Sequence, residues 1–95
     1  MIEVKVVFLS TLVDITGKTE ILISVNEYYN IKQLIEILVS KFGTNFKQVM
    51  FNSNGNLNRY LIISVNGKDI RFIDNSSTII HQGDEITFLP AIAGG

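Results

Sequence analysis

The chain has 95 residues, of which 46% are hydrophobic and 18% charged, a composition typical of one folded domain with a modest core. Its net charge is −1 and its basic side chains are scattered among acidic ones, so we expect no nucleic-acid partner. The chain lacks cysteine, which excludes disulfides, thiolate metal sites, iron–sulfur clusters and a cysteine nucleophile.

The first residues do not have the pattern of a signal peptide, because Glu3 and Lys5 place charges inside the first apolar run. No apolar run approaches the length of a membrane-spanning helix. We therefore expect a single domain over residues 1–95, located in the cytoplasm and without a membrane partner.

Two alternating segments open the chain. Apolar and polar residues alternate over residues 2–9 and again over residues 19–26, which predicts two strands. Residues 14–18 are typical of a turn, so we expect the two strands to form a hairpin joined by a loop.

The hydrophobic period then changes to that of a helix. Apolar residues from Ile31 to Phe42 recur at helical spacing and predict one amphipathic helix. Asn30 is a good N-cap, Gln33 lies in the capping-box position, and Gly43 is suited to end the helix. Residues 44–51 are ambiguous between a loop and a further short turn of helix.

Residues 52–56 have the composition of a loop, and residues 60–65 alternate again as a strand. Asn66-Gly67 is a strong hairpin signal, because both residues tolerate positive φ. The return strand is expected over residues 68–72.

The last strand is expected over residues 85–89, after a turn at residues 81–84. Pro90 has no backbone N–H and is expected to end the strand ladder, so that residues 90–95 form a tail. Strands with one main helix indicate an α+β fold, in which the helix covers one face of the sheet and the other face stays open to solvent or a partner.

The sequence ends at Gly94-Gly95, directly after a short apolar segment. Glycine carries no Cβ, so nothing crowds the terminal carbonyl and the backbone bends freely. Such a tail fits a narrow channel and can offer its carboxylate to the active site of another protein. The alternative is a frayed terminus that ends in glycines by chance.

This order of elements resembles the ubiquitin-like β-grasp fold and, more narrowly, the MoaD-like small subunits of molybdopterin synthase among the ubiquitin-like sulfur carriers. The length and the loop at 52–58 are similar to archaeal members. The residues that carry the resemblance are Phe8, Gly17, Leu34, Leu38, Val65-Asn66-Gly67, Gly83-Asp84-Glu85, Phe88-Leu89-Pro90 and Ala93-Gly94-Gly95.

The resemblance implies that the chemistry takes place at the carboxylate of Gly95, presented by Gly94 and Ala93. In such families an adenylating enzyme uses ATP to form an acyl adenylate, and sulfur then replaces the adenylate as a thiocarboxylate. The large synthase subunit takes in this tail. The chain itself would be a sulfur-donor subunit with no catalytic residues, stably bound cofactor or metal of its own.

A docking surface follows from the expected β-grasp sheet, in which the first and last strands are central and the third strand lies beside the last. Strand alternation then gathers Val7, Ile62 and Leu89 on the open face. Family position instead indicates Phe8 and Leu89 as interface residues. The two criteria disagree at Phe8, which alternation places in the core.

Two other functions remain open. A ubiquitin-like modifier would use the same adenylate and join Gly95 to lysines of target proteins through an isopeptide bond. A non-covalent β-grasp binding module would have an inert tail.

Overall fold

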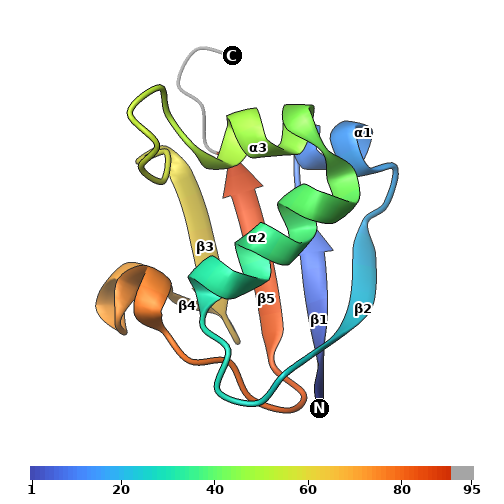
Figure 1. Ribbon diagram of the computed structural model, residues 1–95, viewed down its shortest axis with the longest axis vertical. Helices are drawn as coiled ribbons and strands as arrows, with labels where there is room; N and C mark the ends of the chain where they lie inside the picture. The colour runs from blue at the N-terminus through green and yellow to red at the C-terminus, as the bar shows by residue number, and fades with distance from the viewer. Residues whose placement is uncertain (91–95) are drawn as a thin grey trace.

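In the computed structural model, which describes residues 1–90, five strands form one mixed sheet (Figure 1). The strands are β1 (Ile2–Phe8), β2 (Glu20–Val25), β3 (Leu61–Val65), β4 (Lys68–Asp69) and β5 (Glu85–Pro90). The helices are α1 (Thr11–Thr16), α2 (Ile31–Phe42) and α3 (Thr44–Met50), with short 3₁₀ helices η1 (Ile70–Phe72) and η2 (Asn75–Ser77).

The strand order is β2-β1-β5-β3-β4, with β1 and β5 parallel at the centre. β2 pairs antiparallel with β1, and β3 pairs antiparallel with β5. This is the β-grasp arrangement that the sequence predicts, and it places the last described strand in the middle of the sheet.

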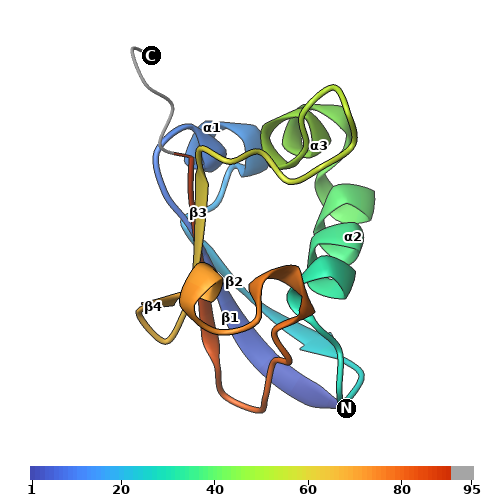
Figure 2. The same cartoon turned by 90° about the vertical axis from the view of Figure 1, so that its left-hand side faces the viewer.

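The helices cover one face of the sheet and leave the other bare, as the edge-on view shows (Figure 2). The buried face of α2 is made of Ile31, Leu34, Ile35 and Leu38, which confirms the predicted apolar stripe. The predicted capping box is present: Gln33 N–H donates to Asn30 Oδ1 and Asn30 N–H donates to Gln33 Oε1, each at 2.9 Å. The ambiguous segment that follows is a helix, α3, which buries Phe46 and Met50.

The prediction of a plain loop between β1 and β2 is wrong, because residues 11–16 form α1. The chain needs this turn of helix to place Leu12, which is fully buried, over one end of the core. Gly17 ends α1 in the left-handed conformation, with φ 73°, and its N–H donates to the Val13 carbonyl at 2.8 Å.

The predicted return strand is also shorter than expected. β4 holds only Lys68 and Asp69, because the Asp69 carboxylate accepts the Arg71 N–H at 2.9 Å and starts η1. This 3₁₀ turn carries Ile70 into the core, where it is 5% exposed.

The expected position of the tail needs one correction. Pro90 does not lie beyond the sheet: it is buried, belongs to β5 and pairs opposite Leu61. Proline can be the last residue of a strand if the neighbouring strand does not need a hydrogen bond from its backbone nitrogen. Within residues 1–90, no helix is long and apolar enough to cross a membrane.

Candidate functional site

The site begins where β5 ends, because this central strand carries the chain to its C-terminal residues. β5 is held on both sides, by β1 and by β3, so its end has a fixed position on the sheet. The predicted reactive residues Ala93, Gly94 and Gly95 lie outside the described residues.

Apolar side chains surround this end of β5 on the open face. Ile62 of β3 lies directly opposite Leu89 of β5, and both side chains are half-buried. Val7 of β1 lies opposite Thr87, so it is one step further back along the same face and diagonal to Leu89. The structure therefore brings together the three residues that strand alternation selects.

Leu9 is a fourth member that the sequence did not single out, although alternation puts it on the same face as Val7. It follows β1 directly, its N–H donates to the Phe88 carbonyl at 3.1 Å, and its side chain is 40% exposed. Val7, Leu9, Ile62 and Leu89 together are called the exit patch below. Such a cluster on a solvent face is typical of a protein-binding site.

The structure corrects the assignment of Phe8 to the interface. Its side chain is 1% exposed and packs among three other rings on the helix side of the sheet. The ring centroids of Phe42, Phe46 and Phe88 lie 5.5, 6.0 and 6.4 Å away. Strand alternation therefore places Phe8 correctly, in the core, whereas family position points to a side chain that is buried in this fold.

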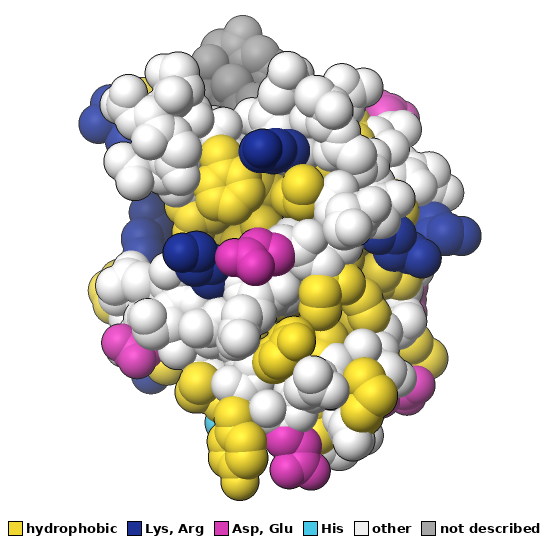
Figure 3. Space-filling model, in the orientation of Figure 1, with side chains coloured by type: hydrophobic (Ala, Val, Ile, Leu, Met, Phe, Trp, Pro, Cys, Tyr) yellow, Lys and Arg dark blue, Asp and Glu magenta, His cyan; other side chains and the backbone are white. Residues whose placement is uncertain are grey.

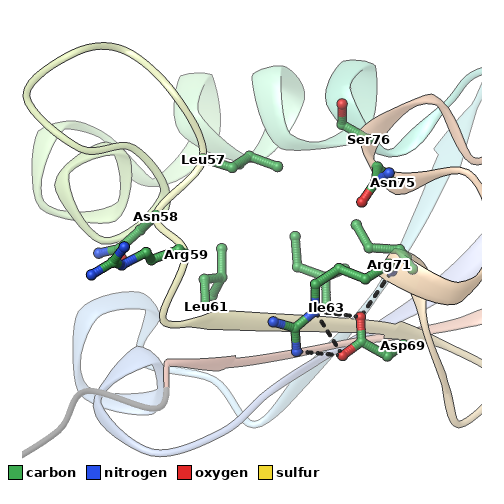
Figure 4. Close-up of a pocket in the computed structure, with 10 residues that line it drawn as sticks. Leu57, Asn58, Arg59, Leu61, Ile63, Asp69, Arg71, Asn75 and Ser76 are labelled. Atoms are coloured by element: carbon green, nitrogen blue, oxygen red, sulfur yellow. Dashed lines mark hydrogen bonds and ion pairs between the residues drawn. The ribbon is translucent and has the colours of Figure 1, made fainter.

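A cavity of about 280 Å³ lies on the other side of β3, between that strand, the 3₁₀ helices and the loop at residues 57–59 (Figure 4). Asp69 and Arg71 pair at its rim, with Arg71 Nη2 2.6 Å and Nε 3.1 Å from the Asp69 carboxylate. Hydrogen bonds from Arg71 hold the pKa of Asp69 below its ordinary value. This carboxylate is therefore committed to a structural pair rather than to proton transfer.

The charged groups do not form a metal-binding cluster in the part of the chain that the structure describes. Among residues 1–90, no three His, Asp or Glu side chains are grouped so as to hold a metal ion. On the helix-covered side, basic and acidic side chains are interspersed (Figure 3). On the open face, Lys5 lies 3.6 Å from Glu20 and 3.8 Å from Glu85.

Comparisons with known proteins agree with this geometry. The model of the ThiS family matches residues 6–95. A putative sulfur carrier protein of Archaeoglobus fulgidus is 30% identical over 69 residues, which cover 73% of this chain and 77% of that protein.

Two solved structures extend the comparison. The small archaeal modifier protein 1 (SAMP1) of Methanosarcina acetivorans superposes with a TM-score of 0.86 at 28% identity, over 100% of this chain and 98% of that chain. A chain from the BexX/CysO complex of Amycolatopsis orientalis superposes with a TM-score of 0.75 at 25% identity, over 97% and 99% of the two chains. The chain belongs to the ThiS family and is a sulfur carrier protein with the ubiquitin-like β-grasp fold.

Proposed function

We propose that the carboxylate of Gly95 is the reactive group of this carrier and that a partner enzyme activates it with ATP. The observation that carries the proposal is the position of β5. This central strand ends beside the exit patch, and the family match continues beyond it to residue 95.

The chemistry explains why activation is needed. A carboxylate is a poor acyl electrophile, so its oxygen first attacks the α-phosphorus of ATP and pyrophosphate leaves. A sulfide equivalent then attacks the acyl carbon, a C–S bond forms and AMP leaves, giving a terminal thiocarboxylate. Dividing one difficult transfer into two easier steps is the general benefit of a covalent intermediate.

The exit patch would hold the partner. Ile62 and Leu89 lie side by side where the chain leaves the sheet, so a protein that docks there receives the C-terminal residues next to its contact surface. The same patch would serve the activating enzyme and the sulfur acceptor in turn, because both must reach the same chain end. No cofactor or metal is needed on this chain.

The sulfur acceptor that we propose first is the large subunit of molybdopterin synthase, supported by the MoaD-like motifs of the sequence. In this pathway the thiocarboxylate sulfur attacks the pterin precursor. A second candidate is a protein modifier joined through Gly95 to target lysines. The likeness to a small archaeal modifier protein at 28% identity over the whole chain favours it. Both functions begin with the same acyl adenylate.

The deciding experiment is the intact mass of the protein purified from its own cells. A mass increase equal to the exchange of one oxygen for sulfur, located at Gly95, supports the carrier. Peptides in which Gly95 is joined to a lysine of another protein support the modifier. A chain that carries neither form, and whose activity survives deletion of Gly95, would refute both and leave a non-covalent binding module.

Reconstitution then identifies the acceptor. Sulfur-loaded carrier mixed with the large subunit of molybdopterin synthase should form a stoichiometric complex and convert the pterin precursor. The carrier without Gly95 is the control, since it keeps the whole described fold. Loaded carrier that transfers no sulfur to this acceptor would contradict the molybdopterin assignment while leaving the loading step intact.

A further inference from the structure

The outer edge of β2 carries unpaired backbone groups. β2 is the last strand on its side of the sheet and pairs with β1 alone among the strands of residues 1–90. Phe8 N–H donates to the Thr19 carbonyl at 2.9 Å, and the register then turns the N–H and C=O groups of Ile21 and Ile23 towards β1. By alternation, the backbone groups of Glu20, Leu22 and Ser24 point away from the sheet.

Apart from the charge of Glu20 at one end, this edge lacks the features with which proteins usually protect an edge strand. Between Glu20 and Val25 the sequence is Glu-Ile-Leu-Ile-Ser-Val, without proline, lysine or arginine. The Leu22 side chain, at the centre of the strand, is 64% exposed on the open face. An unprotected apolar edge is a template for pairing with another strand.

We propose that β2 pairs antiparallel with β2 of a second copy of this chain, in a two-fold register centred on Leu22. In this register Leu22 lies opposite Leu22 of the second copy, and the two Leu22 residues exchange two backbone hydrogen bonds. Glu20 lies opposite Ser24 of the second copy, and Ile21 lies opposite Ile23. All outward-pointing groups of the three edge residues then have a partner.

A second copy fits this edge because the strand is complementary to itself. Leu22 meets an identical side chain, so the most exposed apolar group of the strand gains a cross-strand apolar contact and loses part of its exposed surface. The one charged residue, Glu20, meets a neutral serine, so no like charges oppose each other. A two-fold axis forms a closed dimer and no further β2 edge remains.

The dimer would leave the functional end of each copy free. β2 is antiparallel to β1, and β5 is parallel to β1, so the two-fold places the two ends of β5 at opposite ends of a continuous sheet. The exit patch lies around β5 and is separated from the edge by β1. Pairing through β2 therefore does not depend on the proposed function.

Disulfide cross-linking tests the register. The chain has no cysteine, so each Cys variant has a single thiol. Opposed residues of a hydrogen-bonded antiparallel pair have Cα atoms about 5.5 Å apart, within the range that a disulfide bridges. Leu22→Cys should form covalent dimers at least tenfold faster than Ser24→Cys, whose thiol faces Glu20. It should also react at least tenfold faster than Phe72→Cys, whose site is more exposed than Leu22 but distant from the edge.

Sedimentation of the unmodified chain tests the association itself. Edge pairing buries a small area, so a weak dimer is expected and protein concentrations up to about 1 mM are needed. The unmodified chain should become dimeric over this range. Leu22→Lys should remain monomeric and Phe72→Lys should dimerise like the unmodified chain, with circular dichroism verifying that each variant is folded. A chain that stays monomeric throughout, or equal cross-linking of the three Cys variants, would overturn the proposal.

Discussion

Ile62 of β3 and Leu89 of β5 face each other across two neighbouring antiparallel strands, at the end of the sheet where the chain runs on to its C-terminal residues. This pair therefore lies where the chain leaves the sheet towards Gly95, the residue of the proposed chemistry. β5, the strand that leads to the C-terminal residues, is paired with β3 at Ile62. The side chains of Ile62 and Leu89 are both half-buried, on the face of the sheet without helices.

Replacing either residue by aspartate should weaken binding to the activating enzyme. A charge in the centre of an apolar contact is desolvated without a partner, and we expect Ile62→Asp and Leu89→Asp each to lower the affinity at least tenfold, about 1.4 kcal/mol. Titration calorimetry with the folded variants measures this. Phe72→Asp is the matched control, since Phe72 is 76% exposed and remote from the exit patch. Undiminished binding of folded Ile62 and Leu89 variants would remove the patch from the docking surface.

Phe8→Ala should act on stability rather than on docking. Removing a ring that is 1% exposed leaves a cavity among Phe42, Phe46 and Phe88, so we expect a loss of about 3–5 kcal/mol in urea unfolding. Val7→Ala, on the half-buried open side of the same strand, should cost about 1 kcal/mol or less. A stability loss for Phe8→Ala as small as that of Val7→Ala would contradict the placement of Phe8 in the core.

The Asn66 side chain links the turn after β3 to the turn before β5. Substitutions of Asn66 should separate the contribution of its side-chain hydrogen bonds to stability from that of its backbone conformation. Its Nδ2 donates to Asp84 Oδ1 and its Oδ1 accepts the Glu85 N–H, each at 2.9 Å, while its backbone has φ 52°. Asn66→Gly keeps the positive φ and loses the two side-chain hydrogen bonds, together about 1–3 kcal/mol. Asn66→Ala loses these bonds and also disfavours the positive φ, so it should be less stable than Asn66→Gly by a further ~1 kcal/mol. Equal stability of the two variants in urea would show that the turn imposes no backbone strain.

Asp69→Asn should reduce stability in a pH-dependent way. Arg71 lowers the pKa of the folded-state carboxyl, so the ionised form favours folding. This contribution is fully present above the unfolded pKa of about 3.9 and is lost as the pH falls through the lower folded-state pKa. The stability difference between the unmodified chain and Asp69→Asn should therefore be constant from neutral pH to about 5 and shrink below about 4.

Urea unfolding across this pH range measures the difference, and Arg71→Gln should reproduce the trend because it removes the other partner. Both residues are near solvent, so the effect is small and salt should weaken it. A stability difference that grows as the pH falls would show that the pair does not favour the ionised carboxyl.

Local patterns accounted for most elements of the fold. The helix at residues 31–42 was predicted with its cap residues, because its apolar period and its capping box lie within a few positions of one another. The hairpin at Asn66-Gly67 was also predicted from a local signal, the preference of these two residues for positive φ. The structure confirms it, because both residues have positive φ. Where tertiary contacts outweighed local preference, the prediction failed: α1 forms in a segment with turn composition because it buries Leu12.

The placement of the candidate site was predicted in part. Strand alternation correctly placed Val7, Ile62 and Leu89 on the open face. Family position alone assigned Phe8 to the interface, and the structure places Phe8 in the core. Leu9 was not singled out, although alternation puts it on the open face. Its position beside the end of β5 is visible only in the structure, where its N–H donates to the carbonyl of Phe88, a residue far along the chain. The assignment of Ala93, Gly94 and Gly95 as the reactive end stays a prediction from the sequence, since these residues lie beyond the described part.

The sequence by itself determined most of the elements, the face that each main strand turns to the core and the glycine end, because these depend on neighbours within a few residues. Only the tertiary structure decided that Ile62 meets Leu89, that Phe8 joins the ring cluster and that β2 is left as an open edge. These relationships join distant segments. Their register is set by packing of the whole core, in which each strand finds the neighbour that buries its apolar face.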